Sequence, residues 1–465
     1  MSPELSGFGF DRHMNGSDAV LWTIEADPVL RSTILFVLVF DRPPDRRRLV
    51  ERLELATRAL PRLRQRVVVT PVPGVTPRWV TEPEVDLAYH LRFARAPGQG
   101  TMRDLLDLAR PMVMQGFDRA RPPWEFTVVE GLEHGRAGLI QKVHHSVTDG
   151  VAGIRLALAL LDLEADPAAP PEAPDRPPPP DRTGPLDLVA EAVAYQGRRN
   201  VATARGAVAG LAAAARDPLG AVHRAAGLAL SAGRILLPAP TPLSPVMRGR
   251  SIAVRLDTIT VPLPELKAAA HQVGGTLNDA FMAAMAGGLG RYHRAKGLPV
   301  DRLRVAMPVN VRAGAAQGEA GNRFVPARFE LPVAIADPRE RMAAVRDLVA
   351  RVRAEPVLPV SEAVARLLYR LPHAATVAVF ADMLKGVDML ASNVAGASFP
   401  VYLAGARALS SIAFGPMTGA ASNVTLLSYV GDVSLGISTD PAAVDDPELF
   451  VACLGEGLDE IRALA

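Results

Sequence analysis

Short apolar segments rich in branched and aromatic residues alternate with longer segments of helical periodicity along most of the chain. This alternation predicts mixed α/β structure. In the first third of the chain we expect strands at residues 33–40, 65–69, 89–93, 124–130 and 137–143, with helices at 46–60, 101–114 and 151–163.

The same alternation returns after residue 250. We expect strands at 254–261, 304–311, 324–332, 390–394, 406–414, 423–430 and 433–439, and helices at 263–272, 276–293 and 339–371, the last in two pieces. Asp446, Pro447 and Glu448 then predict the start of a final helix, because proline is favoured in the first turn.

The middle of the chain differs from both ends. Residues 165–185 are dense in proline and acidic residues, which excludes a helix or a central strand and predicts an extended linker. Residues 186–237 are rich in alanine and have helical periodicity up to Asp217-Pro218. We therefore divide the chain into residues 1–164, a linker and helical crossover at 165–250, and residues 251–465.

The charged residues of the first crossover helix fall on one narrow stripe at 100° per residue. They are Asp187, Glu191, Arg198, Arg205 and Arg216. The acidic residues come first, as the helix dipole prefers. Such a helix can lie on anionic lipid, or it can cover a neighbouring domain with its polar stripe in water. We favour domain packing, because a face rich in alanine inserts weakly into a membrane.

Composition narrows the classes of protein. A chain of 465 residues fits two domains or one large one, and a net charge of +2 argues against a dedicated nucleic-acid binder. Cys453 is the only cysteine, so there is no internal disulfide or CxxC site, and we expect it in the core. No signal-peptide layout and no apolar stretch of membrane-spanning length is present, so we expect a cytoplasmic protein.

The segment from His144 to Gly150 carries the clearest chemical motif, HHxxxDG, at the end of a predicted buried strand. Adjacent residues of a strand point to opposite sides, so one imidazole of the pair faces a given cavity. An imidazole exchanges protons near neutral pH and can serve as a catalytic base. Asp149 can buttress the turn or hold a cation that shapes the surroundings of the histidine. The alternative is a buried histidine pair bonded to backbone carbonyls, with Asp149 as a helix N-cap.

Together with two α/β halves, this motif resembles the condensation-domain and chloramphenicol-acetyltransferase-like superfamily. Further segments narrow the resemblance to the bacterial wax ester synthase/diacylglycerol acyltransferase family. They are PPWE at 122–125, TLNDA at 276–280, residues 304–322, SNVAG at 392–396 and YLAGA at 402–406. Pro123 stands where the family usually has leucine, and Ala395 where it often has proline. These departures concern the shape of the acyl pocket more than the chemistry.

The resemblance implies an α/β fold of two chloramphenicol-acetyltransferase-like lobes, with mixed sheets flanked by helices and an active-site channel between the lobes. The lobes would be residues 1–164, which carry the motif, and residues 251–465. His145 would be the general base that lets an alcohol attack a fatty acyl-CoA thioester. The acceptor would be a fatty alcohol or a diacylglycerol, and the product a wax ester or triacylglycerol. Acyl-CoA is a co-substrate, and no cofactor is implied.

The resemblance also gives roles to the neighbours of His145 in the motif. His144 would point away from the chemistry and serve the fold, and Gly150 would follow where the strand turns into a helix. Asp149 would fix the loop through a buried charge pair with an arginine, so its loss should damage folding as well as rate. No covalent acyl-enzyme is expected, because the chain has no GxSxG elbow and Cys453 lacks a reactive setting.

Four further residues are candidates for substrate contact, and each has a structural alternative. Trp124 can be a core aromatic. Asn278, at a helix N-terminus, can donate to an oxyanion or to a CoA phosphate, or can only cap the helix. Asp279 can form a capping box with Thr276. Asn393 can face the channel or satisfy a loop backbone.

Two rival functions remain open at this point. A condensation-type transferase would take acyl groups from carrier proteins, and a non-catalytic member of the fold would only bind lipid. The sequence contains no carrier or adenylation segment, and a pure binder has no need of His145, so we favour the acyl-CoA enzyme. No metal site is expected, because the nine histidines lack ligand spacing with cysteine or acidic residues. Peripheral contact with a membrane or lipid droplet would involve residues 186–237.

Overall fold

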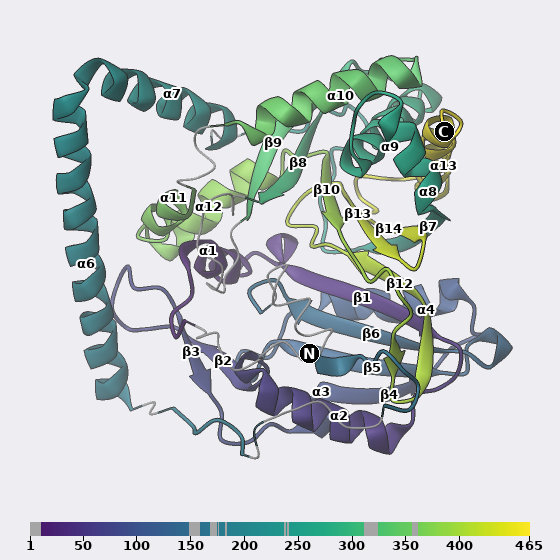
Figure 1. Cartoon of the computed structure of the whole chain (residues 1–465), viewed down its shortest axis with the longest axis horizontal. Coiled ribbons are helices and arrows are strands. Elements are labelled where there is room, and N and C mark those ends of the chain that lie inside the picture. Colours follow the sequence, from purple (N-terminus) through teal and green to yellow (C-terminus); the bar gives the residue numbers. More distant parts are fainter. Residues whose placement is uncertain are drawn as a thin grey trace.

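The computed structural model consists of two α/β lobes with one mixed sheet each (Figure 1). It describes residues 11–147, 159–167, 174, 176–181, 184–236, 239, 241–310, 324–355 and 361–465. Two mixed sheets with helices packed around them confirm the predicted α/β class.

The first sheet has the strand order β11-β12-β1-β6-β5-β4. Its strands are β1 (Thr33–Phe40), β4 (Leu91–Arg95), β5 (Trp124–Glu130), β6 (Ala137–His144), β11 (Tyr402–Leu403) and β12 (Ala406–Phe414). All neighbours are antiparallel except β4 and β5. Around this sheet lie α1 (Gly16–Ile24), α2 (Arg46–Ala59), α3 (Leu87–His90), α4 (Met102–Met114) and the hairpin of β2 (Gln65–Val68) and β3 (Arg78–Thr81). Three short 3-10 helices, η1 (Pro28–Leu30), η2 (Pro61–Arg64) and η3 (Glu133–Gly135), complete the lobe.

The second sheet has the order β7-β14-β13-β10-β8-β9. Its strands are β7 (Arg255–Pro262), β8 (Arg302–Asn310), β9 (Phe324–Pro332), β10 (Met389–Val394), β13 (Ser422–Tyr429) and β14 (Asp432–Thr439). The central strand β10 is parallel to both β13 and β8. The helices of this part are α8 (Leu263–His271), α9 (Leu277–Ala295), α10 (Pro338–Arg353), α11 (Ser361–Leu368), α12 (His373–Leu384) and α13 (Pro447–Arg462).

Helix α9 is the centre of the second core. It is buried over most of its length, between the sheet and helices α10 and α13. Gly288 and Gly457 allow α9 and α13 to lie close together, because a Cβ on Gly457 would be 2.3 Å from the carbonyl oxygen of Ala284. Close helix contact explains why glycine stands inside both helices despite its low helix propensity.

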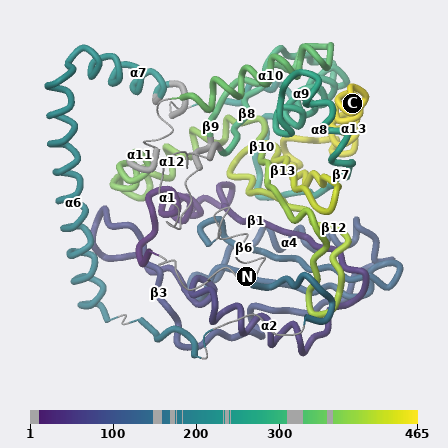
Figure 2. The backbone as a smooth tube through the Cα atoms, in the orientation of Figure 1, coloured from purple at the N-terminus to yellow at the C-terminus, as the bar shows by residue number. Residues whose placement is uncertain are grey.

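Two strands from the C-terminal part of the chain, β11 and β12, belong to the first sheet. β12 belongs to the C-terminal part of the chain but pairs with β1 in the first sheet, as Figure 2 shows. Ile412 lies opposite Val37, and both side chains are buried in the first lobe. Further along the same segment, a Cβ on Gly436 of β14 would be 2.1 Å from the carbonyl oxygen of Ala413, so β12 also contacts the second sheet. The lobes are therefore joined through a continuous β segment.

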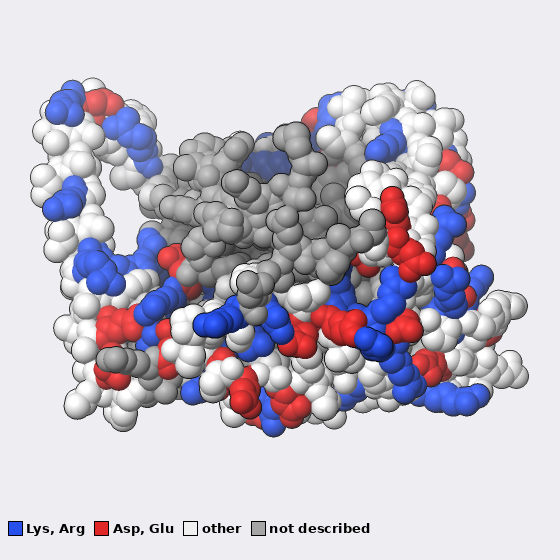
Figure 3. Space-filling view, turned by 60° about the horizontal axis from the view of Figure 1, so that its bottom comes forward, with Lys and Arg blue, Asp and Glu red and all other residues white. Residues whose placement is uncertain are grey.

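Helices α6 (Pro185–Arg216) and α7 (Pro218–Leu236) form an arch that stands away from the body over most of its length (Figures 1 and 3). The helix is interrupted at Asp217-Pro218, as the sequence predicts. The carboxylate of Asp217 accepts the N–H of Gly220 at the start of α7. The prediction that the first crossover helix covers a neighbouring domain is wrong for α6, because Ala192 is its only buried residue. Near its N-terminal end, α6 is held by ion pairs of Glu191 with Arg78 and Arg12 and by a ring stack of Tyr195 on His13.

One predicted strand is displaced. Residues 89–93 were expected to be extended, but the first two of them belong to the helical turn α3, and the strand is β4. The cause is Asp86, whose carboxylate accepts the N–H groups of Ala88 and Tyr89 and caps the turn. Of the helix predicted at 151–163, residues 151–158 lie outside the described residues. Residues 159 and 160 are helical.

Candidate active site

The double histidine stands at the end of β6, between two neighbouring strands. The N–H of His144 donates to the carbonyl of Pro123 at 3.0 Å, and the N–H of His145 donates to the carbonyl of Ser32 at 2.9 Å. The N–H of Val147 then closes a turn on the carbonyl of His144 at 2.9 Å. Backbone hydrogen bonds to the residues that precede β5 and β1 thus hold both histidines in place, independently of their side chains.

The His144 side chain is completely buried and bonded to its own turn. Its Nδ1 accepts the N–H of Ser146 at 3.1 Å and lies 2.7 Å from the Ser146 hydroxyl. Its Nε2 is 3.3 Å from Oε1 of Glu25. The rings of Trp22 and Phe117 meet it edge-on, at 5.0 and 6.0 Å between centroids. This environment gives His144 a structural part, in line with the role that the resemblance implied.

His145 is half-buried, in contrast to its neighbour. Of the two histidines, His145 is therefore the one that a substrate can contact. Asp149 and Gly150 lie outside the described residues, as do Thr148 and the start of the predicted helix. The proposed charge pair of Asp149 stays a prediction.

A buried lysine lies on the same strand, two residues before His144. Lys142 is nearly inaccessible, with its Nζ 3.4 Å from Oε1 of Glu125 and 4.3 Å from the centre of the Phe117 ring. Burial lowers the pKa of Lys142, and the neighbouring carboxylate of Glu125 opposes that shift. Sequence reasoning did not single out Lys142, because a lone lysine in a strand carries no spacing signal.

Trp124 is a core residue with no exposed surface. Its indole N–H donates to the carbonyl of Leu63 at 2.9 Å, and its ring stacks on His90 with 4.3 Å between centroids. The Nδ1 of His90 in turn lies 2.7 Å from the carbonyl oxygen of Trp124. This geometry favours the structural alternative over a substrate contact for Trp124.

Asn278 and Asp279 are both buried at the start of α9, in the second lobe. Asp279 forms the predicted capping box, since its carboxylate accepts the N–H and the hydroxyl of Thr276, each at 2.8 Å. The amide nitrogen of Asn278 lies 3.6 Å from the sulfur of Met307 on β8. Asp279 is therefore occupied by its helix, while Asn278 makes one weak contact.

Asn393 lies near the carboxyl end of β10 and is exposed. Its neighbours across the parallel ladder are on β13, where Leu426 is its register partner. The structure thus separates the four candidates for substrate contact: Trp124 in the first core, Asn278 and Asp279 in the second lobe, and Asn393 at a strand end.

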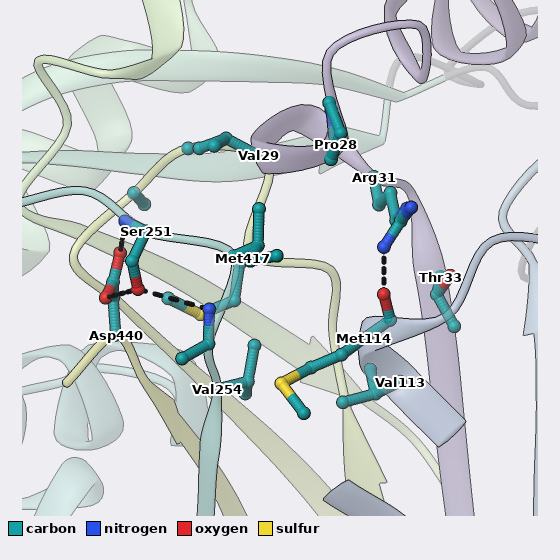
Figure 4. Close-up of a pocket in the computed structure, with 14 residues that line it drawn as sticks. Pro28, Val29, Arg31, Thr33, Val113, Met114, Ser251, Val254, Met417 and Asp440 are labelled. Atoms are coloured by element: carbon teal, nitrogen blue, oxygen red, sulfur yellow. Dashed lines mark hydrogen bonds between the residues drawn. The ribbon is translucent and has the colours of Figure 1, made fainter. Parts of the chain in front are cut away.

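A small pocket lies where the two lobes meet, close to the start of β1 (Figure 4). Arg31 and Thr33 line it from the first lobe, Met114 from the end of α4, and Ser251 and Asp440 from the second lobe. Thr33 is the register partner of His144. The cavity of about 40 Å³ holds a water or two and is too small for an acyl chain.

Cys453 is buried in α13, and burial raises the pKa of its thiol. The thiolate is the nucleophilic form of cysteine, so this environment disfavours reactivity. Among the residues that the structure describes, no three histidine, cysteine or acidic side chains are grouped as metal ligands would be. Within the same residues, no helix is long and apolar enough to cross a bilayer.

Solved structures with this arrangement of lobes define the class of the fold. A wax ester synthase/diacylglycerol acyltransferase from Marinobacter aquaeolei matches with a TM-score of 0.63 at 21% identity, covering 97% of this chain and 99% of that one. The first condensation domain of the calcium-dependent antibiotic synthetase matches with a TM-score of 0.59 at 16% identity, covering 97% and 95%. The fold is thus the one shared by condensation domains and these acyltransferases.

Sequence comparison identifies the family within that class. Residues 14–281 match the wax ester synthase/diacylglycerol acyltransferase catalytic domain, and residues 320–462 match the C-terminal domain of the same family. A protein of Mycobacterium tuberculosis assigned as a diacylglycerol O-acyltransferase is 38% identical over 470 residues, covering all of this chain and 93% of its own length. The chain belongs to the wax ester synthase/diacylglycerol acyltransferase family. This membership confirms the predicted class, an O-acyltransferase of neutral-lipid synthesis.

Proposed function

We propose that the protein transfers a fatty acyl group from acyl-CoA to an alcohol, with His145 as the general base. His145 takes the proton of the acceptor hydroxyl, and the hydroxyl oxygen forms a bond to the thioester carbonyl carbon. The C–S bond then breaks, and His145 returns the proton to the departing CoA thiolate. The half-buried imidazole of His145, on a backbone held by β1 and β5, is the observation that supports this role best.

The acceptor is a fatty alcohol or a diacylglycerol, and the names of the relatives favour the diacylglycerol. Purified protein should release free CoA from palmitoyl-CoA when hexadecanol or dipalmitoylglycerol is added, and only slowly without an acceptor. The acceptor that gives the higher kcat/KM identifies the main product, wax ester or triacylglycerol.

Failure to release CoA with either acceptor would contradict this proposal. The same protein would then be offered a carrier-protein-bound acyl thioester, the substrate of a condensation-type transferase. Turnover of that substrate would show that the acyl donor is a carrier protein instead of CoA. Binding of lipid without consumption of either thioester would indicate a non-catalytic member of the fold.

We further propose that the arch of α6 and α7 contacts a lipid surface, the inner face of the membrane or a lipid droplet, where both substrates collect. Apolar side chains on one side of α6 are exposed to solvent, and Leu186 and Leu211 are 85% and 71% exposed. The charged stripe with Arg198 and Arg205 lies on an adjacent side, at 100° per residue. An exposed apolar stripe next to arginines is the arrangement of helices that lie on anionic lipid.

Replacing Arg198, Arg205 and Arg216 together by alanine should weaken binding to anionic vesicles. Each basic residue near an anionic surface contributes about 1 kcal/mol, so loss of three should weaken binding by about a hundredfold. Cosedimentation with phosphatidylcholine vesicles containing phosphatidylglycerol measures this, and pure phosphatidylcholine vesicles remove the electrostatic part.

A matched triple replacement of exposed arginines on the body, at Arg47, Arg302 and Arg339, controls for net charge. Equal loss of binding in both variants, or no loss in the arch variant, would contradict a lipid role for α6.

A further inference from the structure

The carboxylate of Glu25 touches both chain segments that hold His145. Its Oε1 accepts the N–H of Ser32 at 2.9 Å and lies 3.3 Å from Nε2 of His144. Ser32 is also the residue whose carbonyl accepts the N–H of His145. One oxygen atom thus links the entry to β1 with the end of β6, at the two positions that fix the peptide of His145.

The hydrogen bonds of His144 fix which ring nitrogen carries its proton. A backbone N–H donates only to a ring nitrogen without a proton, and the Ser146 N–H donates to Nδ1. The proton of the neutral ring is therefore on Nε2, which faces Glu25. Glu25 thereby holds the His144 ring in the orientation in which Nδ1 can order Ser146, the residue that follows His145.

Glu25 is itself held in place from the other side. It follows the last residue of α1, and the neighbouring Ile24 and Leu30 are buried against helix α12. Asp27 forms an ion pair of 2.6 Å with Lys385, just after the end of α12. Packing and a charge pair therefore set the backbone position from which the Glu25 side chain reaches His144.

The carboxylate remains charged in this position. Burial alone raises the pKa of Glu25, but the contact with His144, the N–H of Ser32 and nearby Arg119 bring it below its ordinary value. The side chain is only 7% exposed. A charged, buried carboxylate with two specific partners resists displacement, because moving it would leave polar groups unpaired in the interior.

We propose that Glu25 is a positioning residue for the reaction: through His144 and Ser32 it fixes the backbone, and hence the imidazole, of His145. This inference rests on the proposed role of His145 as the base. Alanine at position 25 removes both contacts, the bond from the Ser32 N–H and the 3.3 Å approach to Nε2 of His144. Glutamine keeps an oxygen that can accept from Ser32 and from His144, and removes only the charge.

The expected result is a loss in kcat without a loss in substrate binding. Glu25→Ala should lower kcat about tenfold to a hundredfold, because small misplacements of a catalytic group have effects of that size. The KM for palmitoyl-CoA should stay within about twofold of wild type, because Glu25 contacts no substrate in this arrangement. Glu25→Gln should recover most of the lost kcat. Rates are measured well below the melting temperature of every variant.

Asp388→Ala is the matched control for the loss of a buried carboxylate. Asp388 is inaccessible and accepts the N–H groups of Leu243, Ser244 and Arg304 in the second lobe. Its variant should lose stability with kcat unchanged. An equal drop of kcat in Asp388→Ala and Glu25→Ala would reduce Glu25 to a general structural residue and overturn the proposal.

Other outcomes separate this inference from the proposed function. A folded Glu25→Ala protein with wild-type kcat overturns the positioning role, while an inactive His145→Ala protein in the same assay leaves the base in place. Normal turnover by His145→Ala removes the base itself. If Glu25→Ala does not fold, Glu25→Asp takes its place: it keeps the charge but is one methylene too short, and wild-type kcat in it would equally overturn the proposal.

Discussion

Replacing His145 with alanine is expected to lower the rate of acyl transfer about 10²- to 10⁴-fold, the range for loss of a general base. The protein should stay folded, because the bond from the backbone N–H of His145 to the carbonyl of Ser32 does not depend on the side chain. Release of free CoA from palmitoyl-CoA in the presence of an acceptor measures the rate. Circular dichroism and thermal melting check the fold.

His271 offers a matched control, since it is an exposed histidine at the end of α8. His271→Ala should turn over at the wild-type rate. Near-normal turnover by His145→Ala would end the mechanism proposed above. If the His145→Ala protein does not fold, His145 has a structural role like that of His144.

Local patterns in the sequence predicted the strands well. The predicted strands at 124–130, 324–332 and 406–414 have the same bounds in the structure as β5, β9 and β12. These segments carry dense branched and aromatic residues between turn signals, and burial on at least one face preserves that pattern. The partners of the strands were beyond reach, because pairing of β12 with β1 joins residues hundreds of positions apart.

Helices α1 and α12 escaped prediction for local reasons. Helix α12 has one charged residue, Asp382, so it lacks the polar stripe by which a surface helix is recognised. Helix α1 is short, and its start depends on Asn15, whose side chain accepts the N–H of Asp18. The crossover helices α6 and α7 differ from these two. Their sequence pattern predicted the helices correctly, but it did not predict their surroundings in the fold.

The site was predictable as far as its residues are neighbours in sequence. Adjacent histidines at a strand end predicted that one imidazole of the pair would face a given cavity. The difference in burial, with His144 inaccessible and His145 half-buried, comes from the structure. Glu25 has no motif and lies far from both in the sequence, so its contact with His144 follows only from the tertiary fold. The roles of Asn278 and Asn393 likewise depend on where a substrate binds.

Replacing Trp124 with alanine is expected to destabilise the protein by about 3 to 5 kcal/mol, the range for removing a buried aromatic side chain. The loss combines a cavity in the first core, an unpaired carbonyl at Leu63 and the stack on His90. Trp124→Phe keeps a ring in the core and should lose less than half as much. Urea denaturation followed by circular dichroism measures both.

The same pair of variants distinguishes a core role for Trp124 from a substrate contact. A core residue changes stability first, so folded Trp124→Phe should keep the wild-type KM for palmitoyl-CoA and for the acceptor. Trp79→Phe is the matched control, because Trp79 is equally buried on β3 and outside the double-histidine strand. If Trp124→Phe raised KM while its urea midpoint stayed that of wild type, the indole would line the acyl channel, and the core role argued from its burial would be wrong.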